Sequence, residues 1–442
     1  MAVETLQAEA LFQATDAQTL GFRSTAELPD VDSAMGQDRA IAAIEFGVGI
    51  QREGYNLFVA GPTGIGKRTL VDQLLARHAG ERGEASDWCY VNNFEDPSRP
   101  RALALPPGKG VQLKRDMEKL IERMLVTVPN VFRGDEYRRR ISDIQEEYQE
   151  REGKLFGDLN EEARGKGMVV IRTPGGYTIG PVREGKLMTP AQFNDMSKEE
   201  QDLAKAVIEE LNRKLKTIIE NIHDWQEEST DRVKAIDNEF IHDIIDPMMV
   251  ALKSRYQMYP AVLEFLGAAH QDMAENIWDF MPNEQQEGNT PLRKKVFAME
   301  HLRYHVNVLV DHDGASGVPV LYEDNPTLQN VIGRIEHIAQ MGTLVTNFSL
   351  IKPGALHRAN GGYLVLDARK VLMSSFVWDA LKRAIRSREI RIESIERILS
   401  MVSTTSLEPE PITLDVKIVL VGDRYIYHLL KEYDPEFSLY FK

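Results

Sequence analysis

Short apolar runs near both ends of the chain flank a long middle part in which apolar residues recur every three or four positions. The short runs are typical of strands, and they lie at 55–60, 88–94, 304–310, 318–323, 361–367 and 414–423. The three-to-four spacing predicts helices over 113–128, 134–165 and 198–246, and further helical segments are predicted at 69–79, 327–340 and 374–387. Together these elements predict an α/β domain whose strands come from two separate segments of the chain.

The middle part is predicted to form two antiparallel helical arms that resemble a coiled coil. An arm of 32 residues, such as 134–165, would be about 48 Å long at 1.5 Å per residue. The apolar stripe along the arms, which includes Ile144, Leu211 and Trp225, is expected to form a core rather than a binding surface. The charged runs beside it are expected to be solvated helix faces with ion pairs between residues four apart.

A small β element is predicted between the arms, at 168–188. Two β-rich runs are split there by Pro-Gly-Gly at 174–176, which is typical of a hairpin. Capping-box patterns at 189–192 and 197–200 then restart the helices. The apolar residues of the hairpin are candidates for binding an unfolded polypeptide, with packing onto the arms as the alternative, and they are Val169, Val170, Ile171, Tyr177 and Ile179.

The stretch GPTGIGKRT, at 61–69, lies between the first predicted strand and an amphipathic helix. It has the spacing of a phosphate-binding P-loop (Walker A), G-x-x-x-x-G-K-[ST], in which backbone N–H groups and the lysine hold nucleotide phosphates. However, Arg68 stands where the Mg²⁺-binding hydroxyl is expected, and Thr69 follows one residue late. The candidate nucleotide-binding residues of this stretch are Gly61, Pro62, Thr63, Gly64, Ile65, Gly66, Lys67, Arg68 and Thr69.

Two aspartates at strand ends complete the candidate nucleotide site. Asp367 ends the apolar run 361–367 and matches the Walker B carboxylate that holds Mg²⁺, while Asp423 stands where a γ-phosphate sensor is expected. Either could instead be an ordinary turn residue. Hydrolytic AAA+ proteins place a glutamate after the Walker B aspartate, whereas this chain has Ala368. We therefore predict ATP or ADP with Mg²⁺ as cofactors, Thr69 and Asp367 as metal candidates, and little or no hydrolysis.

The composition is that of a globular protein, with 43% hydrophobic and 27% charged residues. Cys89 is the single cysteine and is expected to be a buried strand residue, which fits a cytoplasmic protein. No stretch approaches the ~20 apolar residues of a membrane span. A net charge of −15 disfavours nucleic acid as a partner. His301 and His305 are four residues apart without a completing glutamate, so a metal site is not predicted there.

Four segments, at 21–69, 88–110, 172–193 and 351–372, resemble the N-terminal part of a bacterial family of Lon-like, Lon-related ATP-dependent proteases. In that family an AAA-like module with a long helical insert precedes a peptidase domain that uses a Ser-Lys dyad. The resemblance implies that this chain is the AAA-like module and that the dyad lies in a C-terminal peptidase domain of the full-length protein.

The resemblance further implies polypeptide substrates and a homo-oligomeric, expected hexameric, ring. It also places residues 36–40 near the adenine. The order of the predicted elements gives a domain organisation that begins with an N-terminal segment and the first part of a P-loop domain at 1–110. A helical insert at 111–300 and the second part of the P-loop domain at 301–442 would follow.

Two other functions are compatible with parts of the pattern. A coiled coil between Walker A and Walker B is also the layout of chromosome-maintenance ATPases. Against that reading, no Leu-Ser-Gly-Gly-Gln signature precedes Asp367, the arms are short and the charge is acidic. A scaffold that binds nucleotide without turning it over is the second alternative, and it overlaps with the favoured reading.

Overall fold

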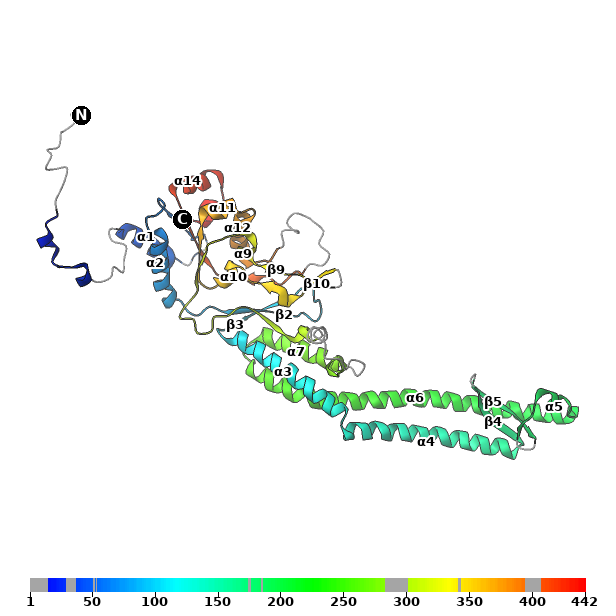
Figure 1. Cartoon of the computed structure of the whole chain (residues 1–442). Coiled ribbons are helices and arrows are strands. Elements are labelled where there is room, and N and C mark those ends of the chain that lie inside the picture. Colours follow the sequence, from blue (N-terminus) through cyan, green and yellow to red (C-terminus); the bar gives the residue numbers. More distant parts are fainter. Residues whose placement is uncertain are drawn as a thin grey trace.

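The computed structural model describes residues 15–28, 37–50, 52, 54–173, 176–183, 186–282, 301–340, 343–393 and 407–442. Gly36, the hairpin turn at 174–175 and the expected insert boundary near residue 300 lie outside these described residues. An α/β body carries a long pair of helices that projects away from it (Figure 1). Among the described residues, no helix is both long and apolar enough to cross a membrane.

A four-stranded parallel sheet forms the centre of the body. Its order is β1-β16-β13-β8, and its strands are β1 (Leu57–Ala60), β16 (Lys417–Gly422), β13 (Tyr363–Asp367) and β8 (Val320–Glu323). In register, Val421 lies between Val59 on one side and Asp367 on the other. Strands predicted near opposite ends of the sequence are therefore neighbours. On the free edge of β1, Phe441 forms a parallel bridge with Asn56.

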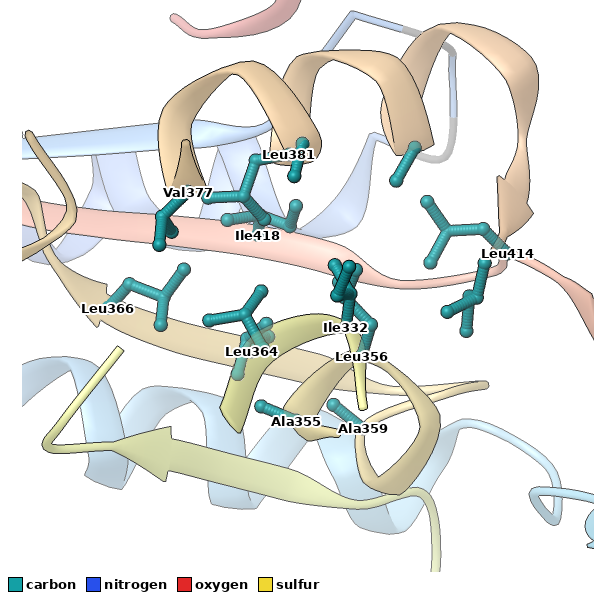
Figure 2. Packing of buried hydrophobic residues seen from close by; sticks show 14 of the residues in the cluster. Ile332, Ala355, Leu356, Ala359, Leu364, Leu366, Val377, Leu381, Leu414 and Ile418 are labelled. Atoms are coloured by element: carbon teal, nitrogen blue, oxygen red, sulfur yellow. The ribbon is translucent and has the colours of Figure 1, made fainter. Parts of the chain in front are cut away.

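Side chains of the sheet alternate between two apolar layers, as a strand period of two requires. Tyr363 and Val365 pack with α1 (Asp38–Gly49) and α2 (Lys67–Glu81) on one face. Leu364 and Leu366 face the opposite layer, part of which Figure 2 shows. The helices of that layer are α9 (Leu328–Ile332), α10 (Ala355–Arg358), α11 (Ala368–Met373), α12 (Val377–Ser387) and α14 (Arg424–Tyr433). Both faces of the sheet are thus covered.

A second sheet is antiparallel, and it contains two of the predicted strands. Its order is β3 (Arg101–Leu105), β2 (Asp87–Val91) and β7 (Val306–Val310). The sequence pattern missed β3. One face of this sheet packs on α3 (Lys109–Phe132), α7 (Pro260–Glu275) and the near end of α6 (Lys198–Arg255). Cys89 is fully buried here, as expected, and burial raises the pKa of its thiol to about 12.

The long helical pair consists of α4 (Asp135–Gly165) and α6. At 1.5 Å per residue, the 31 residues of α4 span about 46 Å and the 58 residues of α6 about 87 Å. The apolar stripe forms a core between them, as predicted, because Leu159, Leu211 and Leu215 are buried in one cluster.

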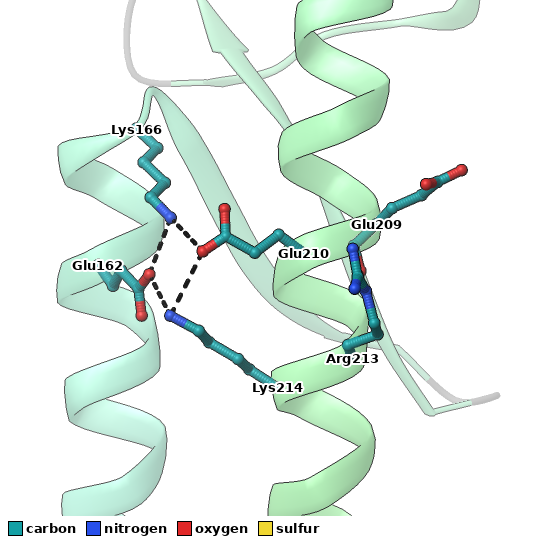
Figure 3. A network of polar contacts seen from close by, with 6 residues as sticks. All are labelled: Glu162, Lys166, Glu209, Glu210, Arg213 and Lys214. Carbon is teal, nitrogen blue, oxygen red and sulfur yellow. Dashed lines mark hydrogen bonds and ion pairs between the residues drawn. The ribbon is translucent and has the colours of Figure 1, made fainter.

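The charged faces of the pair differ from the expectation of simple solvated faces, because they also join the two helices. Lys166 and Lys214 bind Glu162 and Glu210 in a network that links α4 to α6, with nitrogen–oxygen distances of 2.5 to 3.5 Å (Figure 3). Nearer the body, Arg140 makes a two-pronged contact to Glu239 at 2.8 and 2.7 Å. The order of these partners along the two helices shows that the pair is antiparallel.

The predicted hairpin is present at the far end of the pair, as β4 (Met168–Thr173), β5 (Gly176–Arg183) and a short β6 (Lys186–Leu187). Thr189 and Ser197 form the predicted capping contacts with Gln192 and Glu200, and they precede α5 (Pro190–Asn194) and α6. Three of the apolar hairpin residues follow the alternative of packing on the arms, namely Val170, Tyr177 and Ile179.

The helix predicted at 327–340 is wrong beyond Ile332. Gly333 has φ of 89°, so the helix ends there, and two short strands follow. The remaining short elements are β9 (Arg334–Ile335), β10 (Ile338–Gln340), β11 (Thr343–Val345), β12 (Ile351–Lys352), β14 (Glu389–Ile390), β15 (Ile412–Thr413), α15 (Phe437–Tyr440), and 3-10 turns at Ala17–Leu20, Thr25–Glu27, Ile277–Phe280, Leu302–Tyr304 and Phe348–Leu350.

Candidate nucleotide-binding site

The candidate residues gather at the carboxyl edge of the parallel sheet. The loop at 61–66 follows β1, while Asp367 ends β13 and Asp423 follows β16. The backbone N–H of Gly61 donates a hydrogen bond to the carbonyl of Gly422 at 3.1 Å, which ties the loop to the end of β16. Ligands of open parallel sheets bind outside this edge, in the crevice at the carboxyl ends of the strands.

The loop conformation depends on two of its glycines. Gly64 and Gly66 have φ of 85° and 78°, a left-handed conformation that side chains disfavour. A Cβ at either position would meet no atom within 4 Å. The backbone angles, rather than crowding, therefore explain glycine here. Open space beside the loop leaves its backbone accessible, as close approach of a phosphate would require.

Lys67 is the first residue of α2 and turns back over the loop. Its Nζ donates to the carbonyl oxygens of Gly61 at 2.7 Å and Pro62 at 2.5 Å. A lysine charge thus lies beside the N-terminus of a 15-residue helix, whose dipole and unpaired N–H groups already favour an anion. These residues fit the triphosphate or diphosphate of a nucleotide.

Arg68 and Thr69, at the position where a Mg²⁺-binding hydroxyl is expected, fit a metal less well. The guanidinium of Arg68 lies 3.5 Å from the centroid of the Tyr322 ring on β8, and its Nε is 3.5 Å from Asp72. Thr69, which carries a hydroxyl one residue later, is exposed on α2. Sequence reasoning missed Tyr322, because nothing in the sequence pairs the second residue of one helix with a strand 254 positions later.

Asp367 and Asp423 both cap helices. The carboxylate of Asp367 accepts from the backbone N–H of Lys370 at 3.0 Å, and that of Asp423 accepts from Ile426 at 2.8 Å. The alternative of ordinary turn residues is thus supported by geometry. A cap uses only part of a carboxylate's capacity to accept hydrogen bonds, so the remaining lone pairs can still face a ligand.

Ala368 occupies the place of the water-polarising glutamate and is only 1% exposed. Its Cβ would be 3.2 Å from a Cβ built on Gly422, so the position is enclosed by the neighbouring strand. A larger side chain at this buried position would have to move its neighbours.

Two acidic residues at the end of β8 were not predicted as part of this edge. Lys370 pairs with Asp324 at 2.8 Å, and Arg358 pairs with Glu323 at 2.8 Å. The Lys370 ammonium lowers the pKa of the Asp324 carboxyl. The sequence did contain a sign of these two residues, because adjacent acidic residues follow the apolar run of β8. Across the described part of the chain, no group of three or more His, Cys, Asp or Glu residues could hold a metal.

Of the segment expected near the adenine, Gly36 lies outside the described residues. Gln37 precedes α1, and residues 38–40 form its first turn. Side chains of α1 and α2 pack in one cluster against the sheet. The segment thus belongs to the layer that carries the loop.

Two models of known protein families match parts of the chain. The family model described as the LonB-like AAA domain matches residues 316–442, which include β13, β16 and both aspartates. The model described as the Lon-like LonC helical domain matches residues 87–120. These matches support a Lon-related family, with similarity to an AAA-type domain at 316–442 and to a Lon-like helical domain at 87–120.

One curated relative is the "Putative Lon protease homolog" of Escherichia coli (strain K12), which is 33% identical over 88 residues. That match covers 20% of this chain and 14% of the relative. Among solved structures, NtrX from Brucella abortus is 16% identical, with coverage of 34% of this chain and 29% of that chain. Its TM-score of 0.19 is too low to support a statement on fold or function.

Proposed function

We propose that the chain is the nucleotide-binding and substrate-handling AAA module of a Lon-like, ATP-dependent serine protease. The observation that carries the proposal is the loop at the carboxyl edge of the parallel sheet, with left-handed Gly64 and Gly66 and with Lys67 turned over it. ATP or ADP would bind there through its phosphates. The matches to Lon-like AAA and helical models support the family context.

The same proposal treats the parallel sheet as one P-loop core that is discontinuous in sequence. Its first part would lie in residues 1–110 and its second in 301–442, since β1 pairs with β16. Residues 111–300 would be a coiled-coil-like insertion that carries the β tip. Antiparallel packing of α4 on α6 supports this division.

Within the loop, backbone N–H groups and Lys67 would hold the phosphates and offset their charge. Thr69 and Asp367 would be the residues that hold Mg²⁺, and Asp423 would contact the γ-phosphate. Bound Mg²⁺ would supply charge neutralisation at the β- and γ-phosphates. Hydrolysis would be slow, because Arg68 replaces the metal-binding hydroxyl and Ala368 cannot polarise water.

The work of the module would be to deliver unfolded or damaged polypeptides to the Ser-Lys peptidase domain of the full-length, cytoplasmic protein. We propose a homo-oligomeric ring, hexameric in the Lon-like manner, as its assembly. Enclosure of Ala368 also favours a second possibility, a scaffold that binds nucleotide without turnover. The chromosome-maintenance alternative gains no support from the family matches.

Isothermal titration calorimetry with ATP and with ADP tests the proposal. We expect binding that Lys67→Ala weakens by at least tenfold, because one charge-assisted contact to phosphate is worth roughly 1.5–3 kcal/mol. The matched control is Lys431→Ala, an exposed lysine on α14. A folded protein that binds neither nucleotide at millimolar concentration would refute the proposal.

A further inference from the structure

A separate cavity of about 410 Å³ lies at the opposite edge of the parallel sheet. It is lined by Asn56, just before β1, by Lys417, the first residue of β16, and by residues at the C-terminal end of α12. The phosphate-binding loop lies at the other end of these strands. Six residues of β16 separate the two edges by about 20 Å.

Positive charge dominates the lining of this cavity. Its charged residues, among those the structure describes, are one carboxylate, Asp415, and five cations, Arg52, Arg82, Arg386, Arg388 and Lys417. Such a concentration contrasts with the net charge of −15 for the whole chain. Like charges that converge on one cavity repel one another, so the arrangement is most stable when an anion lies between them.

Lys417 is held in place by the end of a helix. Its Nζ donates to the carbonyls of Gly47 at 2.5 Å and Val48 at 3.2 Å, and to that of Ile50, at the C-terminus of α1. Despite these bonds, burial and the nearby Arg82 lower the pKa of Lys417 to about 8. The charge therefore carries a desolvation cost that an anion in the cavity would offset.

Arg388 has a backbone conformation that glycine would adopt more easily. It caps α12 with φ of 57° and ψ of 33°, and its carbonyl accepts from the N–H of Leu414 at 2.8 Å. Glycine is the common residue at such a left-handed helix end, because every Cβ is disfavoured there. A strained residue that lines a cavity points to a functional role for its side chain.

Arg82 and Arg386 complete the cationic lining from two further elements. Arg82 caps α2, and its guanidinium carbon lies 5.3 Å from the ring centroid of Tyr363, at the start of β13. Arg386, in the last turn of α12, is 3.6 Å from Glu436. One guanidinium group can donate two parallel hydrogen bonds to the oxygens of a phosphate. Arginines that approach from several elements therefore suit a compact anion with more than one phosphate.

We propose that this cavity binds a small molecule that carries two or more phosphate groups, independently of the loop at 61–69. A cavity of about 410 Å³ has the size of a small-molecule site, which favours a compact ligand over a polymer. The acidic surface elsewhere on the chain would also repel an extended polyanion such as nucleic acid or an acidic polypeptide.

The test titrates inorganic tripolyphosphate into the Lys67→Ala variant in 150 mM NaCl, so that the contribution of the loop at 61–69 is reduced. We expect one binding site, and at least tenfold weaker binding when Arg388→Gly and Arg386→Gln are added. Arg388→Gly alone should weaken binding while the Tm stays equal or rises, because it relieves the strained backbone. Arg383→Gln is the control, since this arginine lies on the same helix but outside the cavity lining.

Three results would overturn the proposal. The first is that tripolyphosphate does not bind to Lys67→Ala. Any binding of tripolyphosphate by the wild type would then be assigned to the loop, and the proposed function would be unaffected. The second is unchanged affinity after both arginine substitutions in a folded protein. The third is tighter binding of polyglutamate or of a single-stranded oligonucleotide than of tripolyphosphate, which would make the cavity part of a macromolecular interface. Failure of nucleotide binding at the loop would leave the tripolyphosphate result unaffected.

Discussion

The guanidinium carbon of Arg68 lies 3.5 Å from the centroid of the Tyr322 ring, which is within the range of a cation–π contact. This contact holds the arginine on the β8 side of α2. The position that would offer a hydroxyl to Mg²⁺ in a standard loop is thus taken by a cation. Repulsion between this charge and a divalent metal leads to the first prediction.

Nucleotide binding is expected to depend little on Mg²⁺ in the wild type. The Kd for ADP should change less than threefold between 5 mM MgCl₂ and excess EDTA, since Arg68 replaces the hydroxyl that would bind the metal and repels a divalent cation. Arg68→Thr should bind ADP more tightly with Mg²⁺ than with EDTA. Arg77→Thr, at an exposed position on the same helix, is the control. A strong Mg²⁺ requirement in the wild type would contradict this prediction.

Ala368→Glu is expected to destabilise the protein without restoring hydrolysis. The side chain at 368 is buried beside Gly422, and an unpaired carboxylate placed there costs several kcal/mol. The Tm in calorimetry should fall by several degrees, and phosphate release should stay at the wild-type level. Arg369→Glu, one residue further and exposed, should leave the Tm nearly unchanged. A stable Ala368→Glu protein with several turnovers per second would show that the enclosure was misjudged.

His357 is expected to make the fold less stable in acid. It is fully buried, its Nδ1 accepts from the N–H of Gly354 at 3.2 Å, and burial lowers its pKa to about 3. Above pH 6.5 the imidazole is neutral in both states, so it contributes no pH dependence. Below pH 6.5 the unfolded chain takes up a proton that the folded chain does not, which lowers the free energy of unfolding by about 2 kcal/mol at pH 5.

Urea unfolding at pH 7 and pH 5 measures this effect. His357→Gln should reduce the loss of stability between the two pH values, because glutamine can accept the same N–H and does not titrate. Burial also lowers the pKa of a second histidine, His312. Some acid sensitivity should therefore remain in His357→Gln. An unchanged difference between pH 7 and pH 5 in His357→Gln would exclude His357 as a cause.

The sequence predicted elements with strong local patterns and missed those that depend on distant partners. The helices of the arms and the hairpin followed from apolar periodicity, and Gly64 and Gly66 from the loop spacing. Pairing of β2 with β7 in a separate antiparallel sheet could not be foreseen, because strand pairing is set by long-range packing. Likewise, β3 is only five residues between prolines, too short for its period to stand out.

At the candidate site, the sequence identified which residues reach the carboxyl edge but not what their side chains contact there. The helix-capping role of Asp367 was one of two alternatives, since an aspartate at the end of a strand serves either purpose. The stacking partner of Arg68 and the pairing of Lys370 with Asp324 involve segments far apart in sequence. Local patterns carry no information on such contacts.

The last prediction separates the two faces of the β tip. Met168 and Val170 of β4 pack in the arm cluster, as does Tyr177, whose ring stacks on Phe156 with centroids 4.5 Å apart. Because side chains of a strand alternate, Val169 lies on the opposite face of β4. A polypeptide that binds the tip would therefore meet the face that carries Val169 and Ile171.

We expect the double variant Val169→Ser and Ile171→Ser to weaken binding of unfolded casein, measured by fluorescence anisotropy, while leaving hydrogen exchange of the tip unchanged. Tyr177→Ala is the contrasting variant. It should raise hydrogen exchange in β4 and β5, because it removes a partly buried ring contact, yet leave β1 and β13 protected, since these strands belong to a different apolar cluster. If casein binds the double variant as tightly as the wild type, the tip is structural on both faces, and the polypeptide surface is to be sought next in the segment 351–362, where β12 and α10 lie.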